Sequence, residues 1–243
     1  ITAEDVGMET SDMDLVREVT PYVTGISEAK GGAGNPSPIT AYGVFMGMKA
    51  AAKFKFGTDV LEDRKVFVQG IGHVGESLVE HLTTEGAQVV IADINQARLE
   101  AVSAKYGATI YTGSDIYSEA MDIYAPCALG ATVNDETINK LQAKVIAGAA
   151  NNQLADEQKH GAILQEKGIV YAPDFLINAG GIINVYAELE GYGKKDIMRK
   201  TENIYNTTLD ILNLAQSSHI TTHQAALNMA QDRIETRKKE LSK

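Results

Sequence analysis

The stretch Val66-Phe67-Val68-Gln69-Gly70-Ile71-Gly72-His73-Val74-Gly75 decides the fold. Its first residues form a short apolar run of the kind found in a buried parallel strand. Its three glycines have the spacing Gly-x-Gly-x-x-Gly, and apolar residues then recur every four positions, as they do on one face of a helix. The stretch therefore predicts a strand over 66–70, a tight glycine turn and a helix over 74–85.

Each glycine has a physical reason to lack a side chain if this turn holds a dinucleotide. Gly70 permits the tight turn out of the strand, Gly72 lets the backbone approach a pyrophosphate, and Gly75 lets the helix pack closely on the strand. The pyrophosphate would meet the free backbone N–H groups at His73 and Val74 and the positive end of the helix dipole. Glycine-rich turns also serve structure or bind other nucleotides, so the context of this turn matters.

An acidic residue lies where such a site needs one. The apolar run Val89–Ala92 predicts a second buried strand, and Asp93 follows it, 23 residues beyond Gly70. The acid that binds the ribose 2′-hydroxyl of NAD is expected at ~20 residues, and a carboxylate there repels the 2′-phosphate of NADP. No arginine follows immediately, so the sequence predicts NAD, with Asp93 and Ile94 among its contacts. Taken alone, Asp93 would be a polar strand end or a helix cap.

Composition excludes several classes of protein. The 243 residues are 44% hydrophobic and carry a net charge of −10, which suits a globular chain and disfavours nucleic acid or a membrane surface as a partner. We expect no membrane span, no signal peptide and, since histidines lack ligand spacing, no metal site. The single cysteine, Cys127, indicates a reducing, cytoplasmic location, and a small buried residue is a better interpretation of it than a nucleophile.

Strands and helices alternate from Val66 onward. This alternation predicts an α/β fold with a doubly wound, mostly parallel sheet of the Rossmann type, flanking helices and a helical C-terminal extension. We expect strands at 66–70, 88–92, 108–111, 121–125, 145–148 and 169–172. We expect helices at 13–18, from Pro38 (with Ser37 as the N-cap) to Phe56, and at 74–85, 95–105, 134–141, 155–167, 180–190, 195–216 and 222–241.

Five further segments carry a family resemblance over essentially the whole chain. They are Thr2-Ala3-Glu4-Asp5-Val6-Gly7, Gly34-Asn35-Pro36-Ser37-Pro38-Ile39-Thr40-Ala41-Tyr42-Gly43, Tyr124-Ala125-Pro126-Cys127-Ala128-Leu129-Gly130, Gly148-Ala149-Ala150-Asn151-Asn152-Gln153 and Asn178-Ala179-Gly180-Gly181. In this order they resemble the Glu/Leu/Phe/Val dehydrogenase family. The resemblance implies NAD-dependent oxidative deamination of L-amino acids to 2-oxo acids, by homo-oligomers whose active sites lie in a cleft between two domains.

The resemblance also divides the chain. It implies a linker and edge of the substrate domain at 1–37, a dinucleotide-binding domain at 38–177, and a helical segment returning to the cleft at 178–243. The family's glycine-rich segment with the catalytic lysine, and its second lysine for the substrate carboxylate, match no part of this sequence. Lys30 lies in a different context. We therefore expect this chain to be the cofactor-binding part of the subunit and to lack the catalytic lysine.

Residue roles follow from the same resemblance. Asp5 matches the family's catalytic aspartate, which shuttles protons at the amine. Thr40 resembles the residue that contacts the nicotinamide carboxamide. Cys127, Ala128 and Asn151 resemble the stretch that lines the nicotinamide ribose and ring, and Asn151 also faces the substrate.

Three aliphatic residues bear on specificity. Ala3, Ile182 and Val185 match positions that line the side-chain pocket, and their size suits branched-chain substrates, with L-leucine giving 4-methyl-2-oxopentanoate and ammonia. A phenylalanine- or valine-preferring member of the family stays open, because one methylene discriminates by only ~1–3 kcal/mol. Two other classes are weaker alternatives. Asp5 and the Asn-Asn and Asn-Ala-Gly-Gly motifs argue against a non-catalytic NAD-binding domain. The full glycine pattern and the later dehydrogenase motifs argue against a methyltransferase whose glycine turn binds adenosine.

Overall fold

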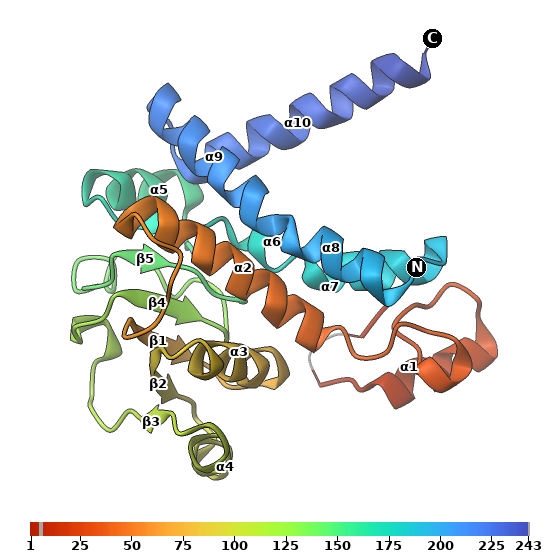
Figure 1. Ribbon diagram of the computed structural model, residues 1–243, viewed down its shortest axis with the longest axis horizontal. Coiled ribbons are helices and arrows are strands. Elements are labelled where there is room, and N and C mark those ends of the chain that lie inside the picture. The colour runs from red at the N-terminus through yellow and green to blue at the C-terminus, as the bar shows by residue number, and fades with distance from the viewer. Residues whose placement is uncertain (5–6, 243) are drawn as a thin grey trace.

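The computed structural model describes residues 1–4 and 7–242 and shows a parallel sheet with helices packed around it (Figure 1). The strands are β1 (Lys65–Gln69), β2 (Gln88–Ala92), β3 (Thr109–Ile110), β4 (Ile123–Pro126), β5 (Val145–Ile146) and β6 (Val170–Tyr171). The helices are α1 (Thr10–Val19), α2 (Ser37–Phe56), α3 (His73–Thr84), α4 (Gln96–Tyr106), α5 (Glu157–Glu166), α6 (Asp174–Ile177), α7 (Gly180–Glu190), α8 (Lys194–Glu202), α9 (Ile204–Ser218) and α10 (Thr222–Leu241), with 3₁₀ turns at Glu28–Lys30 and Ile116–Ser118.

The sheet has the topology expected of a doubly wound fold. Its six strands lie in the order β3-β2-β1-β4-β5-β6, and every pair is parallel. The order reverses between β1 and β4, and open α/β sheets bind ligands in the crevice at the carboxyl ends of the strands at such a point. The six predicted strands are therefore confirmed, with ends that differ by one or two residues.

Side chains of the central strand alternate between two apolar layers. Val66 and Val68 are fully buried against a layer that includes α2, α3 and α4. Phe67 points to the other face and packs in a second layer with Tyr124 of β4 and Leu164 of α5. Burial of a side chain such as Phe67 contributes about 1.5–3 kcal/mol, so this alternation fixes which face of β1 meets which helices.

Helix α2 connects the sheet to the C-terminal helices. It packs on α3 and also on α7, α8 and α9, which run beside it in Figure 1. Close approach to α9 depends on a small residue, since a Cβ on Gly43 would lie 2.9 Å from Cδ1 of Ile204. Ile204 and Leu212 of α9 belong to the same core cluster as the β1 valines. The C-terminal helices thus share the core of the parallel-sheet fold.

Helix α10 extends the molecule away from the sheet. Its first turns pack Ala225 and Ala226 against Ile211 and Ala215 of α9, whereas the rest of the helix projects outward (Figure 1). Leu227, Ile234 and Leu241 are exposed along it. In the described part of the chain, no helix combines the length and apolar character needed to cross a membrane.

Two predicted helices take a different form. Residues 135–140 form turns, because Asn134 Oδ1 accepts the N–H groups of Glu136 and Thr137 at 3.0 and 3.2 Å and such side-chain bonds compete with helix formation. The predicted helix 195–216 is two helices, since Asn203 ends α8 and caps α9. Asparagine favours helix ends over helix interiors.

The start of α2 also differs from the prediction. The helix begins at Ser37, and Pro36 occupies the N-cap position without a side-chain bond. Asn35 Oδ1 accepts the N–H of Ser37 at 2.8 Å, so the upstream asparagine supplies the acceptor expected from Ser37. The prediction of Ser37 as the cap was therefore wrong, although Pro38 does lie in the first turn.

A half-buried histidine makes stability depend on pH. His81 of α3 stacks on the ring of Phe45, with centroids 5.3 Å apart, and lies tilted against the ring of Tyr42, with centroids 5.5 Å apart. Burial lowers the pKa of His81 below its ordinary 6.5, although the charge of Glu80 opposes this effect. The unfolded chain therefore binds the proton more readily than the folded chain. The free energy of unfolding falls as the pH drops below the pKa of free histidine.

We expect the wild-type chain to lose more free energy of unfolding between about pH 7.5 and about pH 5.5 than His81→Phe, which keeps an aromatic ring in the stack. Urea denaturation at the two pH values measures the difference. Equal losses in the two proteins would assign the acid sensitivity to other groups.

Candidate functional site

Four loops meet at the carboxyl edge of the sheet, on both sides of the point where the strand order reverses. They comprise residues 70–72 after β1, 93–95 after β2, 127–131 after β4 and 148–153 after β5. Backbone bonds join neighbouring loops, such as the one from the N–H of Ala131 to the carbonyl of Asn152 at 2.7 Å. The structure therefore gathers most of the predicted cofactor residues at one edge.

The three glycines of the turn have different surroundings. Gly70 has a φ of +94°, and a Cβ there would lie 2.6 Å from the Cβ of Ala128. A Cβ on Gly75 would lie 2.1 Å from the carbonyl oxygen of Gly70. A Cβ on Gly72 would have no atom of the described chain within 4 Å. The packing of the protein requires the first and third glycines, whereas the second faces open space.

Gly75→Ala is expected to destabilise the chain strongly, because its methyl group would collide with the backbone of the turn and not with a flexible side chain. Overpacking of this kind costs about 1–3 kcal/mol or more. Urea denaturation measures the change. A stability equal to that of the wild type would show that the turn relaxes around the methyl group.

The beginning of α3 leaves backbone donors at this edge. Gly72 is the N-cap, and the first intrahelical bond runs from the N–H of Glu76 to the carbonyl of Gly72 at 2.8 Å. The N–H groups of His73, Val74 and Gly75 precede that bond, so helix geometry provides them with no partner. The positive end of the helix dipole adds to their attraction for an anion.

Asp93 is bound to the glycine turn. Its Oδ2 accepts the N–H of Ile71 at 2.8 Å, and its Oδ1 accepts the N–H of Asn95 at 2.9 Å. The cap of α4 is Asn95 and not Asp93. Sequence reasoning did not anticipate that this carboxylate holds the turn in place. Ile94, beside it, is fully exposed.

The side chain of Cys127 lies against the loop that follows β5. The N–H of Ala149 donates to its Sγ at 3.5 Å, and burial raises the pKa of the thiol to about 12. The thiol is therefore protonated at neutral pH and unsuited to nucleophilic attack. The next residue, Ala128, is exposed and lies against Gly70.

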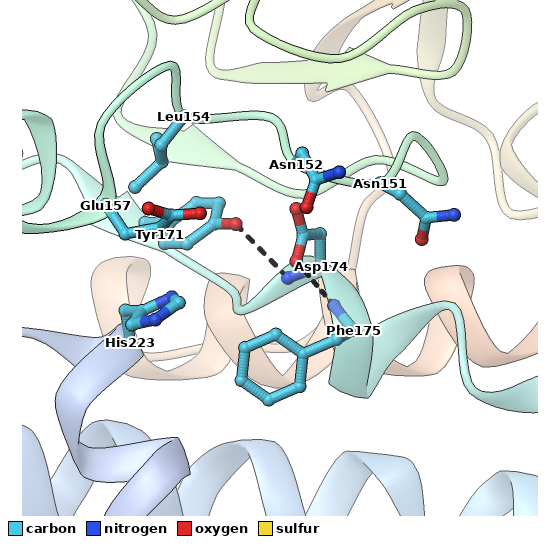
Figure 2. Close-up of a pocket in the computed structure, with 8 residues that line it drawn as sticks. All are labelled: Asn151, Asn152, Leu154, Glu157, Tyr171, Asp174, Phe175 and His223. Carbon is cyan, nitrogen blue, oxygen red and sulfur yellow. Dashed lines mark hydrogen bonds between the residues drawn. The ribbon is translucent and has the colours of Figure 1, made fainter.

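Asn151 is exposed at the rim of a cavity of about 250 Å³ (Figure 2). The cavity is lined by Asn151, Asn152, Leu154, Glu157, Tyr171, Asp174, Phe175 and His223. Beyond it, Asn178 Nδ2 donates to Oδ1 of Asn151 at 2.5 Å and to the carbonyl of Ala149 at 3.1 Å. The sequence contained Asn178 within a recognisable motif, but only the structure shows its bond to Asn151.

Thr40 lies where α2 and α7 approach each other. A Cβ on Gly180 would lie 2.2 Å from the carbonyl oxygen of Ile39, and one on Gly181 would lie 2.8 Å from Thr40 Oγ1. The Thr40 hydroxyl donates to the carbonyl of Pro36 at 2.9 Å. Its proton is thus engaged, and its lone pairs remain available to accept a hydrogen bond.

The predicted pocket residues lie on α7 and on the N-terminal segment. Ile182 is exposed and Val185 half-buried, and both lie on one face of α7. Ala3 follows Thr2, which pairs with Val23. This N-terminal region is fastened to α7 by Glu188, whose Oε2 accepts the N–H groups of Gly25 and Ala33 at 2.9 Å each.

The remaining predictions concern the catalytic aspartate, Lys30 and a metal site. Asp5, the predicted catalytic residue, lies outside the described residues. Lys30 forms ion pairs with Asp14 and Glu18 at 3.9 and 3.6 Å, which places it in a local surface cluster. Within residues 1–4 and 7–242, no group of three or more His, Cys, Asp or Glu side chains is arranged to hold a metal ion.

Comparison with known proteins relates this geometry to a family. The sequence profile described as "Glutamate/Leucine/Phenylalanine/Valine dehydrogenase" matches residues 31–97 and 91–240. Leucine dehydrogenase of Thermoactinomyces intermedius is 53% identical over 98% of this chain and 65% of its own length. Leucine dehydrogenase of Bacillus subtilis is 54% identical over 97% of this chain and 64% of its own length.

A solved structure agrees. The crystal structure of L-tryptophan dehydrogenase from Nostoc punctiforme superposes with a TM-score of 0.86 at 43% identity, over 98% of this chain and 68% of that one. The chain thus spans just under two thirds of the length of its leucine dehydrogenase relatives. On the sequence profile, the identities and the fold together, the chain belongs to the glutamate/leucine/phenylalanine/valine dehydrogenase family.

Proposed function

We propose that this chain binds NAD at the carboxyl edge of its sheet and supplies the cofactor side of a dehydrogenase for branched-chain L-amino acids. The open space in front of Gly72, next to the Asp93 carboxylate, is the observation that carries the proposal. A pyrophosphate fits where a Cβ would meet no atom of the described chain, and an acid at the end of the neighbouring strand suits a ribose hydroxyl. The identity to leucine dehydrogenases supports the reaction and substrate class.

The two halves of the sheet would hold the two halves of the cofactor. The adenosine half would lie against Asp93 and Ile94, and the pyrophosphate against the turn and the first N–H groups of α3. The nicotinamide half would lie beyond the reversal point. Its contacts would be Thr40, Cys127, Ala128 and Asn151.

The chain's own residues have distinct tasks in this reaction. NAD, when bound, provides the acceptor for the hydride that leaves the α-carbon of the amino acid. Thr40 would accept a hydrogen bond from the nicotinamide carboxamide, since its own proton is bonded to Pro36. Cys127, protonated and apolar, would border the ring without reacting. Asp5 would move protons at the substrate nitrogen.

Aliphatic side chains would set the specificity. Ile182 and Val185 project from one face of α7, and with Ala3 they would bound a pocket of medium size. We expect the protein that contains this chain to reduce NAD with kcat/KM at least about tenfold higher for L-leucine than for L-phenylalanine. Amino-acid-dependent NADH formation, monitored by absorbance, measures the ratio. A preference for phenylalanine, tryptophan or glutamate would contradict the proposed substrate class.

The division into 1–37, 38–177 and 178–243 is proposed as a division of tasks. Because Ile204 and Leu212 share the core with β1, the last segment would fold together with the nucleotide-binding part.

We also propose assembly into a homo-oligomer, supported by the apolar residues exposed along the projecting α10. Light scattering coupled to gel filtration tests this; a monomer at all concentrations would contradict it.

A further inference from the structure

The loop that carries Asn151 is fixed in position by buried polar groups. Gln153 is fully buried, and its Nε2 donates to the carbonyls of Gly148 and Ala150 at 2.8 and 2.9 Å. The Gln153 N–H donates to Oδ2 of Asp174, a carboxylate that is only 6% exposed, at 2.9 Å. These three hydrogen bonds hold the backbone of the loop in place, although the buried Oε1 of Gln153 has no partner among the described residues.

With the backbone fixed, the main remaining freedom of Asn151 is the orientation of its carboxamide. One end of that group accepts hydrogen bonds and the other donates them, and the two ends have nearly the same shape. A half-turn of the amide would therefore change the chemistry offered at the edge of the sheet without changing its shape.

Asn178 selects one of the two orientations. Its Nδ2 donates to the carbonyl oxygen of Ala149, which marks that nitrogen as the donor end because a backbone carbonyl can only accept. The same Nδ2 donates to Oδ1 of Asn151 at 2.5 Å. Oδ1 of Asn151 is thereby engaged, and Nδ2 of Asn151 has no hydrogen bond among the described residues. In Figure 2 the Asn151 side chain extends away from Tyr171 and His223.

We propose that Asn178 is a positioning residue that holds the Asn151 amide so that its Nδ2 donates to an oxygen of the nicotinamide riboside half of the cofactor. The inference rests on the proposed function. Asn151 follows β5, on the half of the sheet opposite Asp93, and each half of such a sheet binds one mononucleotide. Asn178 acts through Asn151, which distinguishes it from a residue that contacts the cofactor itself.

A double-mutant cycle on the chain tests the inference with two ligands. NADH contains the nicotinamide riboside and ADP lacks it. Asn178→Ala is expected to weaken NADH binding about tenfold, the usual effect of one misplaced hydrogen bond, and ADP binding less than about twofold. In an Asn151→Ala background, Asn178→Ala is expected to add less than about twofold.

Two further variants sharpen the test. Asn178→Asp cannot donate, so it would draw in the donor end of Asn151 and turn the carbonyl outward; we expect NADH to be weakened at least as much as by Asn178→Ala. Asn206 provides a matched control, since its Nδ2 donates to Oδ1 of Asn203 at 3.1 Å in another asparagine pair on the helical extension. Asn206→Ala should leave both affinities unchanged. Unaltered NADH affinity in Asn178→Ala, or effects that add fully with Asn151→Ala, would overturn the inference.

A measurement without ligand separates this inference from the proposed function. In a ¹⁵N-labelled chain, the side-chain amide signals of Asn178 should shift in Asn151→Ala, because they lose a hydrogen-bond acceptor. Unshifted signals would refute the bond itself. If the signals shift but the wild-type chain does not bind NADH, the bond between Asn178 and Asn151 exists. Its role in cofactor binding and the proposed function would then both be rejected.

Discussion

Gly72→Val is expected to abolish NADH binding while the chain stays folded. Gly72 has a φ of −60°, which valine adopts without strain, and its Cβ would meet no described atom within 4 Å. The Cβ of the new side chain would occupy the volume assigned to the pyrophosphate. We expect the Kd for NADH, measured by fluorescence titration, to rise at least about 100-fold, which corresponds to about 2.8 kcal/mol.

Gly193→Val is the matched control for this change. Gly193 is also the N-cap of a helix, has a φ of −79°, and offers a Cβ equally open surroundings within the described structure. The two substitutions should therefore have similar effects on the free energy of unfolding, whereas only Gly72→Val should affect NADH. If a folded Gly72→Val chain retained its affinity, the pyrophosphate would have to lie elsewhere.

Asp93→Arg is expected to reverse the preference between NAD and NADP. The wild-type carboxylate can accept hydrogen bonds from the ribose 2′-hydroxyl and repels a 2′-phosphate, while arginine attracts the phosphate. We expect the ratio of the two dissociation constants, measured by titration with NADH and NADPH, to change by about 100-fold or more. An unchanged ratio would remove the assigned role of Asp93.

The bonds of Asp93 to the turn require a control, because arginine also deprives the N–H groups of Ile71 and Asn95 of their acceptors. Asp93→Asn keeps one acceptor oxygen and removes the charge. We expect it to shift the NADH-to-NADPH ratio in the same direction by about tenfold, with a smaller loss of stability than Asp93→Arg. A shift in Asp93→Arg alone would attribute the effect to the introduced charge and not to the lost carboxylate.

The sequence could predict the parts of the fold that depend on local patterns. The strand at Val66, the glycine turn and the helix after it are encoded in one short stretch, and the apolar runs that follow gave all six strands. Two of the failures arose where an asparagine side chain bonds to the backbone, and the third arose where an asparagine ends one helix and begins the next. Asn134 turned a predicted helix into turns, Asn203 divided another, and Asn35 took the acceptor role expected of Ser37.

The sequence could propose the residues of the candidate site, but it could not predict the bonds between them. Gly72 and Asp93 follow from the motif, because close approach and ribose binding constrain residue type at fixed spacing. The bond from Ile71 to Asp93 and the bond from Asn178 to Asn151 join residues 22 and 27 positions apart. Such contacts depend on how the loops fold over the edge of the sheet, so no periodicity in the sequence reports them.

Titration of the wild-type chain with NADH, alongside NADPH and S-adenosylmethionine, tests the proposed cofactor site most directly. We expect saturable binding of NADH, binding of NADPH weaker by about tenfold or more, and no binding of S-adenosylmethionine. If the folded chain bound S-adenosylmethionine or NADPH in preference to NADH, the edge formed by Gly72, Asp93 and Asn151 would not be an NAD site.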